Sequence, residues 1–430
     1  MSFLDQVGDI IKNNKDTWDY YSCHYNKDMT NIFDNPKCYI QDTFMNAGKK
    51  MLILSEDEYN NFNITEARAA HSISSFFLGI ILAEGLLGNF NKFVETDDKS
   101  YPFSYIWNLT CLYHDYGYQL ENDKELSKKL LNKIHGVKKY NNIRDAMRVR
   151  PYYYGIYNLR KEKNIRESIW RSYRHAEYCC KSINESESCN ECQAVKEIEK
   201  YYTHVHKVVN VDSINVTIPV RTSNEISRYF TYRLIHCNCV GCIDHGIAGG
   251  MLFFDRIIKN YAKTYLQARM YNMHTDIMEF MYSDLHFSFN QLKIFAYIAD
   301  CIINHNIWKA QLNNVNIYQD FFLDKLIGDK FEKINYYKNP LLFILIMSDT
   351  LEPYKNFNED SIDKRPYNKF EPSKIFERFN ILVGHEVIKV SVDENLKHRC
   401  WEKLIDMQDW IDIRCEQNNN EFAIILNKRM

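Results

Sequence analysis

The chain has 430 residues, of which 45% are hydrophobic and 14% aromatic, so it can bury a large core and is not a disordered protein. Its net charge of −2 at pH 7 gives no overall electrostatic case for nucleic-acid or membrane binding. The N-terminus shows no basic stretch followed by an apolar run, and the apolar runs are too short to cross a bilayer. We therefore expect a soluble cytoplasmic protein.

Apolar residues at helical spacing predict a mainly α-helical protein. After a mixed, partly helical start over 1–60, residues 64–90 are expected to form a helix that begins at Thr65. A second helix is predicted over 103–120, ended or bent at Gly117. The later predicted helices cover about 244–270, 289–309, 340–356 and 394–411. Strands are predicted where β-branched residues alternate, at 208–220, 387–392 and 422–426.

Composition divides the chain into four parts. Residues 1–120 and 241–356 carry the strongest apolar helical patterns and are expected to form the two halves of one helical domain. Residues 121–240 are more polar and hold several basic runs, which predicts an inserted lobe. Residues 357–430 are expected to form a small α/β C-terminal tail.

Imidazole and carboxylate groups recur along the helical segments in one order. The residues are His71, His114, Asp115, His245, His305 and Asp349. Each lies in or beside an apolar stretch, where an unpaired polar group is costly to bury. Any one of these histidines alone is more often an ordinary core or surface residue, but the ordered set favours a hydrolytic metal site. Two divalent ions about 3.5–4 Å apart can clamp a phosphate group and activate water.

The geometry expected of this site has two parts. Three helices that pack with His71, His114, Asp115 and Asp349 inward would give one ion four ligands. The carboxylate of Asp115 has two oxygens, so it can bridge to a second ion held by His245 and His305.

The segments around these residues resemble the HD-domain metal-dependent phosphohydrolase superfamily. The resemblance covers parts of 65–120 and 243–356. It is carried by the segments Arg68–Ser72, Tyr113–Gly117, His245–Leu252, Ile303–Asn306 and Leu345–Asp349. It implies a helical bundle with the metal site at its centre, holding one or two divalent ions (Mn²⁺, Fe²⁺ or Mg²⁺). It also implies hydrolysis of a phosphate ester of a nucleotide by metal-activated water.

Residue roles carry over from that family by position. His71, His114, Asp115 and Asp349 match its four-ligand core, and two further histidines of members with two ions match His245 and His305. Asp115 and Arg68 are the expected catalytic residues, because Arg68 shares a helix face with His71 and can steady a phosphate charge. Lesser candidates for contacting phosphate are Arg256, Lys259, Lys309 and Lys355.

Two positions depart from the family pattern. Many members carry a phosphate-binding lysine where this chain has Tyr118, and deoxynucleotide triphosphohydrolases carry a His and a Pro-Phe run where Tyr118-Gln119-Leu120 follows. The substrate therefore stays open among a cyclic nucleotide, a deoxynucleoside triphosphate and a monophosphate. The partner expected is a nucleotide-type small molecule, and a homo-oligomer is compatible with the sequence.

The same ligands fit two other functions. An HD-type diiron oxygenase uses the same ligand set, and a non-catalytic nucleotide sensor would keep the site for binding alone. Other common sites have no motif in this sequence, which lacks GxxxxGK[ST], GxGxxG and Gly-x-Ser-x-Gly. Basic runs over 128–171, with the tyrosines at 152–154, could contact a nucleic-acid strand, although a solvated surface is the commoner role of such runs.

Cysteines form a second constellation. The chain has 13 cysteines, an odd number that suits thiols or metal ligands better than a disulfide framework. Cys189 and Cys192 form one CxxC pair, and Cys239 and Cys242 form another. Four thiolates at such spacing can hold a structural zinc ion, which would tie the inserted lobe to the chain just before His245. Chance pairs and a redox CxxC are the alternatives.

Overall fold

The computed structural model describes residues 2–13, 32–41, 65–88, 90–96, 99–121, 123–125, 127, 208–211, 214–218, 220–236, 242–270, 286, 289–356, 371–419 and 421–427. Most of these residues are helical. The helices are α1 (Phe3–Asn13), α3 (Pro36–Ile40), α5 (Glu66–Leu86), α6 (Phe103–His114), α7 (Tyr118–Glu121), α13 (Ser223–His236), α14 (His245–Met270), α16 (Phe289–Asn304), α17 (Val315–Asp320), α18 (Pro340–Leu351), α19 (Pro353–Asn356), α20 (Glu371–Glu377) and α21 (Glu394–Gln408). Three short 3₁₀ helices lie at Leu312–Asn314, Asp324–Leu326 and Gly328–Lys330.

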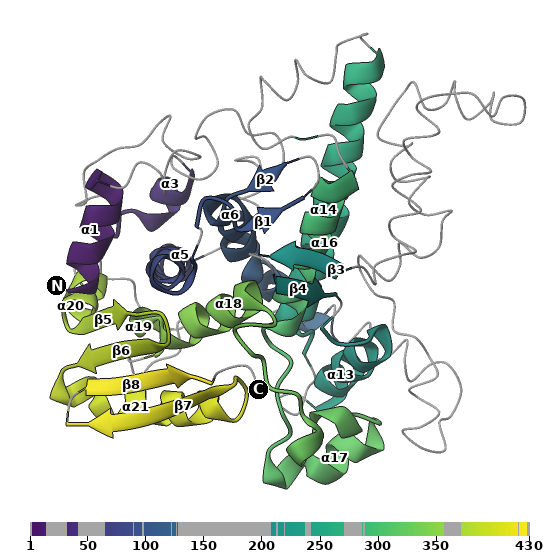
Figure 1. The fold of residues 1–430 in the computed structure, drawn as a ribbon. Helices are drawn as coiled ribbons and strands as arrows, with labels where there is room; N and C mark the ends of the chain where they lie inside the picture. Colours follow the sequence, from purple (N-terminus) through teal and green to yellow (C-terminus); the bar gives the residue numbers. More distant parts are fainter. Residues whose placement is uncertain are drawn as a thin grey trace, which may run out of the picture.

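Eight strands form two antiparallel sheets. The strands are β1 (Val94–Glu95), β2 (Ser100–Tyr101), β3 (Val208–Val211), β4 (Ile214–Thr217), β5 (Phe379–Val383), β6 (Val387–Val392), β7 (Ile413–Asn418) and β8 (Glu421–Leu426). Their orders are β2-β1-β3-β4 and β5-β6-β8-β7. In Figure 1 the second sheet lies beneath the helical part, with α5 seen end-on above it.

Helix α5 lies at the centre of the helical part. The hydroxyl of Thr65 accepts a hydrogen bond from the backbone N–H of Arg68 at 3.2 Å, so the helix begins where the sequence predicts. By length and composition α5 is apolar enough to cross a membrane, yet most of its residues are buried among other elements. Trp107 of α6 lies close against Gly79 and donates from its indole N–H to the carbonyl of Phe76 at 2.8 Å, which joins α6 to α5.

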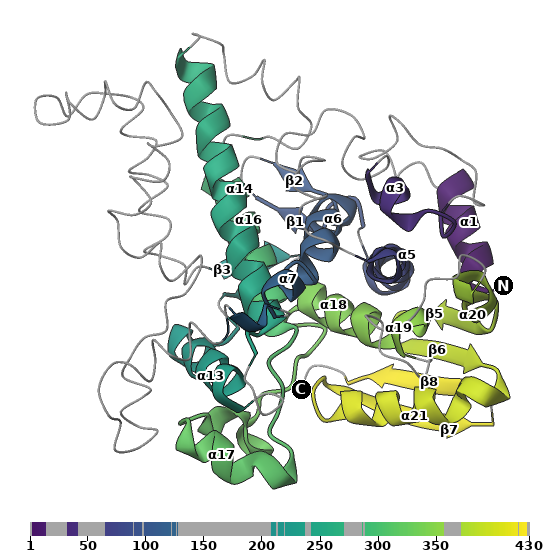
Figure 2. The same cartoon turned by 180° about the vertical axis from the view of Figure 1, so that it is seen from behind.

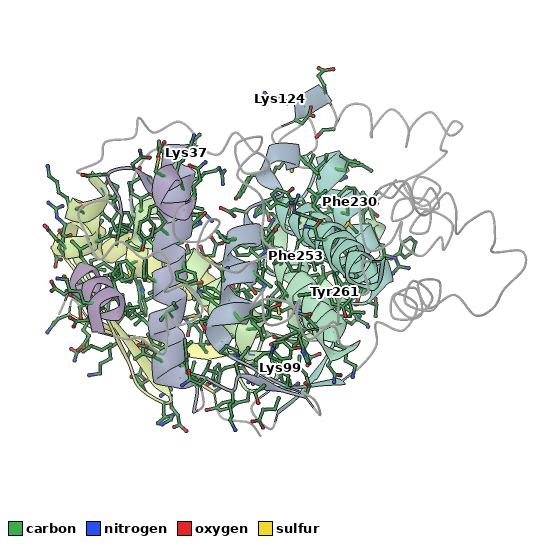
Figure 3. The ribbon with its side chains drawn as sticks, turned by 90° about the horizontal axis from the view of Figure 1, so that it is seen from above. Lys37, Lys99, Lys124, Phe230, Phe253 and Tyr261 are labelled. Carbon is green, nitrogen blue, oxygen red and sulfur yellow. The ribbon has the colours of Figure 1, made fainter. Side chains whose placement is uncertain are left out.

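Two adjacent glycines bring helix α14 close to its neighbours. A Cβ on Gly249 would lie 3.1 Å from the backbone nitrogen of Gly117, and one on Gly250 would lie 2.6 Å from the carbonyl oxygen of Ala299 in α16. Farther along α14, Phe253 packs against Tyr113 of α6, with ring centroids 4.8 Å apart (Figure 3). The glycines therefore allow this close helix contact.

The hairpin β3–β4 continues the small sheet of the helical part. Val211 pairs with Val94 of β1, and Val208–Val211 pairs with Ile214–Thr217 in antiparallel register. The backbone N–H of Val220 donates to Asp300 of α16 at 2.8 Å. Burial raises the pKa of that aspartate to about 7. Both the hairpin and α13 thus pack on the helical part, although they lie within the range 121–240 assigned to an inserted lobe.

The C-terminal sheet shares the core of the helical part. Residues buried on one face of β5, β6 and β8 alternate with more exposed ones, and this buried face belongs to the same hydrophobic cluster as the core helices. Phe3 of α1 packs on Phe376 of α20, with ring centroids 5.4 Å apart, and the side chain of Gln6 donates to the carbonyl of Ile381 at 2.7 Å. Figure 2 shows from behind that α1 and α20 lie together beside β5.

Several elements differ from the sequence prediction. The helix expected over 103–120 stops at His114, and a turn at 115–117 separates it from α7. A side chain at Gly117 would overlap the carbonyl oxygen of His245, so glycine is required for this close approach. Helix α13 and strand β7 were not predicted.

The close contact between α14 and α16 gives a test of the fold. We expect Gly250→Ala to lower the free energy of unfolding by about 1–3 kcal/mol, because the added methyl meets backbone and the Ile303 side chain. Gly88→Ala is the matched control, since nothing lies within 4 Å of its added Cβ. Denaturant titrations of both variants measure the difference, and equal midpoints would contradict the close contact.

Candidate metal centre

Five helices bring the six predicted ligands to one place. The residues are His71 on α5, His114 and Asp115 at the end of α6, His245 at the start of α14, His305 just after α16, and Asp349 in the last turn of α18. The four histidines are buried, and the two aspartates are half-buried. Most of these groups lie at helix ends. The start of α14 comes close to the turn after α6 and to the residues just after α16.

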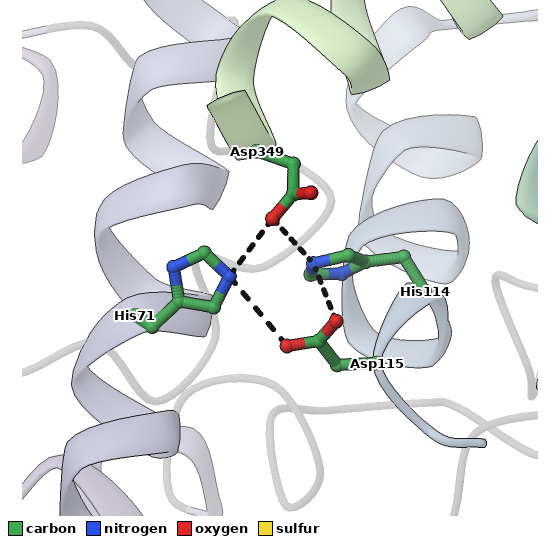
Figure 4. A group of neighbouring side chains, drawn as sticks. All are labelled: His71, His114, Asp115 and Asp349. Carbon is green, nitrogen blue, oxygen red and sulfur yellow. Dashed lines mark ion pairs between the residues drawn. The ribbon is translucent and has the colours of Figure 1, made fainter. Parts of the chain in front are cut away.

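The first cluster joins His71, His114, Asp115 and Asp349 (Figure 4). Nε2 of His71 lies 3.2 Å from Oδ1 of Asp349 and 3.5 Å from Oδ2 of Asp115. Nε2 of His114 lies 3.3 Å from Oδ1 of Asp115 and 3.7 Å from Oδ1 of Asp349. Two atoms that each bind one ion at about 2.1 Å lie roughly 3.0–3.4 Å apart. The spacing is therefore close to that of ligands around a single cation.

The second cluster joins Asp115, His245 and His305, whose ligand atoms lie within 4.8 Å of one another. The ring centroids of His245 and His305 are 5.3 Å apart, and those of His114 and His305 are 5.7 Å apart. Asp115 belongs to both clusters. A carboxylate with two oxygens can serve two cations at once.

Each of the four imidazole rings donates from Nδ1 to an acceptor, which leaves Nε2 for the cluster. His114 and His305 donate to the carbonyl oxygens of Cys111 at 2.7 Å and Ile302 at 2.6 Å, and a carbonyl can only accept. His71 and His245 face carboxylates at Nδ1 in the same way. Neutral rings with Nδ1–H have a lone pair on Nε2, which is the form that binds metals.

The polar atoms inside the clusters fit a cation. Within the described residues, Nε2 of His71, His114 and His305 and Oδ1 of Asp115 are buried and make no hydrogen bond. A buried polar atom without a partner is costly, and a metal ion is the partner that suits an imidazole nitrogen next to carboxylates. The residues present therefore could hold one divalent ion in each cluster.

Glu352 supports the first cluster from behind and was not predicted from the sequence. It is fully buried and accepts from Nδ1 of His71 at 2.9 Å and from the hydroxyl of Ser74 at 2.5 Å. It also accepts from the backbone N–H groups of Tyr354 at 2.9 Å and Lys355 at 2.7 Å. Glu352 follows Asp349 by three residues, so the two side chains lie on one side of the chain as α18 ends.

Glu121 supports the second cluster and was also missed. Its Oε2 accepts from Nδ1 of His245 at 2.8 Å, and its Oε1 accepts from Arg233 of α13 at 3.2 Å. Arg233 lies 3.3 Å from Asp244, which caps α14 by accepting from the backbone N–H of Ile247 at 2.9 Å. Burial opposes the charge of Glu121, but the hydrogen bond from His245 and the nearby Arg233 charge act together with the other contacts to lower the pKa of Glu121.

Tyr118 lies between two groups of the site. Its ring stacks on His245 with centroids 3.9 Å apart and an interplanar angle of 13°. The guanidinium of Arg68 lies 3.5 Å from the centre of the same ring and 3.4 Å from Oδ2 of Asp115. Tyr118 therefore fixes the planes of a predicted ligand and a predicted phosphate-binding residue.

Burial and charge act in opposite directions on the protonation of the first cluster. Burial and the nearby Lys355 charge disfavour a charged His71, but the neighbouring carboxylates of Asp349 and Glu352 raise its pKa above the ordinary 6.5. Burial likewise opposes a charged His114, and the carboxylate charges raise its pKa. In the second cluster, burial and the neighbouring imidazoles lower the pKa of His305 to about 3.

The lesser candidate cations are scattered. Lys355 lies 2.6 Å from Oδ1 of Asp349 and belongs to the site. Lys309 instead faces the exposed Asp409 at 4.0 Å. Arg256 stands eleven residues beyond the start of α14, about 16 Å along the helix. The side chain of Lys259 lies outside the described residues.

The cysteine constellation is described only in part. Cys189, Cys192 and Cys239 lie outside the described residues, as do the basic runs over 128–171. Cys242 is buried, and its thiol hydrogen-bonds to Glu121. This places the end of the second CxxC pair next to the group that orients His245.

No family model, no curated protein and no solved structure matches this chain.

The hydrogen bond from His245 to Glu121 generates a first test of the centre. We expect Glu121→Gln to weaken binding of the second Mn²⁺ ion by about 10–100-fold while the first ion binds as before, because the lost charge reduces the basicity of His245 alone. Calorimetric Mn²⁺ titration resolves the two events. Glu332→Gln, an exposed residue paired with Lys338, is the control. Equal losses at both ions would refute separate support of the second cluster.

Metal affinity is expected to fall as the pH is lowered. His71 and His114 must lose a proton to bind an ion, and their pKa is raised in the metal-free protein. Below these pKa values each displaced proton costs up to about tenfold in affinity per pH unit. In the metal-free protein the same charged rings stabilise the fold, fully below pH about 6.5, and this contribution is lost as the pH rises through the raised pKa values.

Mn²⁺ titrations and thermal unfolding at a series of pH values from about 5.5 to 8 measure both effects. We expect tighter Mn²⁺ binding and a less stable metal-free protein at the high end. An affinity that does not change with pH would mean that neither ring is a ligand.

Proposed function

We propose that this chain is an HD-type metal-dependent phosphohydrolase that cleaves a phosphate ester of a nucleotide. One observation carries the proposal, which is that Asp115 is shared by two clusters of buried ring nitrogens. Five helices supply those groups, as the resemblance to the HD superfamily implies. Ions bound there would polarise a phosphoryl oxygen and lower the pKa of water.

Charge at the site supports an anionic substrate. The carboxylates are Asp115, Asp349, Glu121 and Glu352. The positive charges beside these carboxylates are Arg68 and Lys355. Arg233 and Asp244 offset each other. One divalent ion balances this set, and a second leaves two positive charges in excess. A phosphate group, with a charge near −2 at neutral pH, would restore the balance.

The protein's own residues divide the work. His71, His114 and Asp349 would hold the first ion, and Asp115 would join it to the second. Arg68 would contact the phosphate, with its guanidinium kept in plane by Tyr118 and Asp115. The acceptors behind the rings keep Nε2 aimed inward, so little reorganisation is needed when the substrate binds.

The two cations beside the ligands favour this reaction over the oxygenase. A diiron oxygenase would use the same histidines and carboxylates, but its oxygen chemistry has no need for Arg68 and Lys355 at the ligand edge. A nucleotide sensor would also need these cations, so only turnover separates it from a hydrolase. Substrate class within the nucleotides is set by contacts beyond these clusters.

The deciding experiment is hydrolysis of a nucleotide panel by the Mn²⁺-loaded protein. The panel holds cyclic mono- and dinucleotides, deoxynucleoside triphosphates and monophosphates. We expect turnover of one class, and a loss of roughly a hundredfold or more in Asp115→Asn, because both ions lose their shared ligand. Asp409→Asn, at an exposed position, is the matched control.

Each other outcome points elsewhere. Oxygen consumption by the Fe²⁺-loaded protein, without nucleotide turnover, would replace the proposal with the oxygenase. Nucleotide-induced thermal shifts without turnover would replace it with the sensor. Turnover that persists in Asp115→Asn would place the reaction outside these clusters.

A further inference from the structure

Lys355 lies at the partly open edge of the first cluster. Its Nζ is 2.6 Å from Oδ1 of Asp349, the same oxygen that faces Nε2 of His71 and His114. About a fifth of the lysine side chain is exposed (22%), whereas the Arg68 side chain is 9% exposed. The ammonium is therefore the more accessible of the two cations at the site.

The backbone of Lys355 is tied to the cluster by one carboxylate. Glu352 accepts from the backbone N–H of Lys355 at 2.7 Å and, with the same Oε2 atom, from Nδ1 of His71 at 2.9 Å. Because Glu352 is fully buried, helix α19 cannot shift without disturbing His71. The backbone of Lys355 is therefore held beside the cluster, within side-chain reach of Asp349.

An ion held by Oδ1 of Asp349 and an ammonium held by the same oxygen repel each other. A single carboxylate oxygen does not offset both charges, and water at this half-buried edge screens them weakly. An anion that contacts the ion and the ammonium together removes the repulsion. A phosphate oxygen suits this place, since lysine binds phosphate as a compact point charge.

Tyr118 cannot supply the positive charge that contacts a phosphate oxygen, whereas Lys355 can. The tyrosine ring is held between Arg68 and His245, at 3.5 Å and 3.9 Å, and carries no positive charge. Arg68 in turn is engaged by Tyr118 and by Asp115 at 3.4 Å. Arg68 pairs with Asp115 and Lys355 pairs with Asp349, so each cation shares its carboxylate with a metal position, and Lys355 is the more exposed of the two.

We propose that Lys355 is a catalytic residue that binds the phosphate group of the substrate beside the first metal position. The proposal rests on the metal centre and the anionic substrate of the proposed function. It adds a second phosphate contact, from α19, to the contact proposed for Arg68. A purely structural ion pair with Asp349 is the alternative.

The test uses inorganic phosphate, the common product group, as the probe of the Mn²⁺-loaded full chain. Lys355→Met removes the charge and keeps most of the stem, and Lys355→Arg restores the charge. Lys309→Met is the matched control, because that lysine faces the exposed Asp409. Calorimetry measures Mn²⁺ affinity first and phosphate affinity of the loaded protein second.

We expect Lys355→Met to weaken phosphate binding by roughly 10–100-fold, the worth of one charged hydrogen bond. Its Mn²⁺ affinity should stay equal or become tighter, because a repelling charge is gone. Lys355→Arg should recover phosphate binding to within about threefold of the unaltered protein, and Lys309→Met should match the unaltered protein throughout.

Two results would overturn the proposal. Unchanged phosphate binding in Lys355→Met would show that Lys355 does not contact phosphate. A loss of Mn²⁺ binding or of folding in that variant would show that its role is structural. Neither reading depends on turnover. A chain that hydrolyses no nucleotide but binds phosphate through Lys355 would end the proposed function and the catalytic role, and would leave the phosphate contact of Lys355 standing.

Discussion

The carboxylate of Glu352 joins three parts of the chain at one buried point. It accepts from His71 and Ser74 of α5 and from the first backbone N–H groups of α19, just after α18 ends. A buried carboxylate is stable only when its oxygens are satisfied, so the three elements must keep their mutual positions. Removal of this group would leave Nδ1 of His71 with only the Ser75 hydroxyl at 3.4 Å, and would remove the acceptor of the first N–H groups of α19. The orientation of the first cluster thus depends on a residue that does not itself point at a metal.

The second cluster depends on a steric constraint. Its ligand His245 starts α14, and this helix start reaches Asp115 only because the turn after α6 carries no side chain at Gly117. Gly249 and Gly250 then let α14 lie against α6 and α16 on two sides, which brings His305 next to His245. A larger side chain at any of these positions would separate the helices by more than a shared carboxylate can span.

Sequence patterns predicted the elements that carry the ligands better than the groups that orient them. Helices α5, α14 and α16 are long and apolar, and caps such as Thr65 mark their starts, so periodicity identifies them. The six ligands could be found because His and Asp stand out in apolar surroundings. Helix α13 is more polar and was missed, although it buries Ile226, Tyr229 and Leu234 at helical spacing.

The orienting groups could not be predicted because their partners are distant in the chain. Glu121 and His245 are 124 residues apart, and Glu352 and His71 are 281 residues apart. Nothing in the local pattern of a surface-like glutamate indicates which imidazole it will meet after folding. Tyr118 was visible only as a departure from a family pattern. In the structure its ring occupies the space between Arg68 and His245, so a positive charge at that position would face a guanidinium at close range. The site instead places its second cation on α19, where Asp349 neutralises it and the edge of the cluster is open.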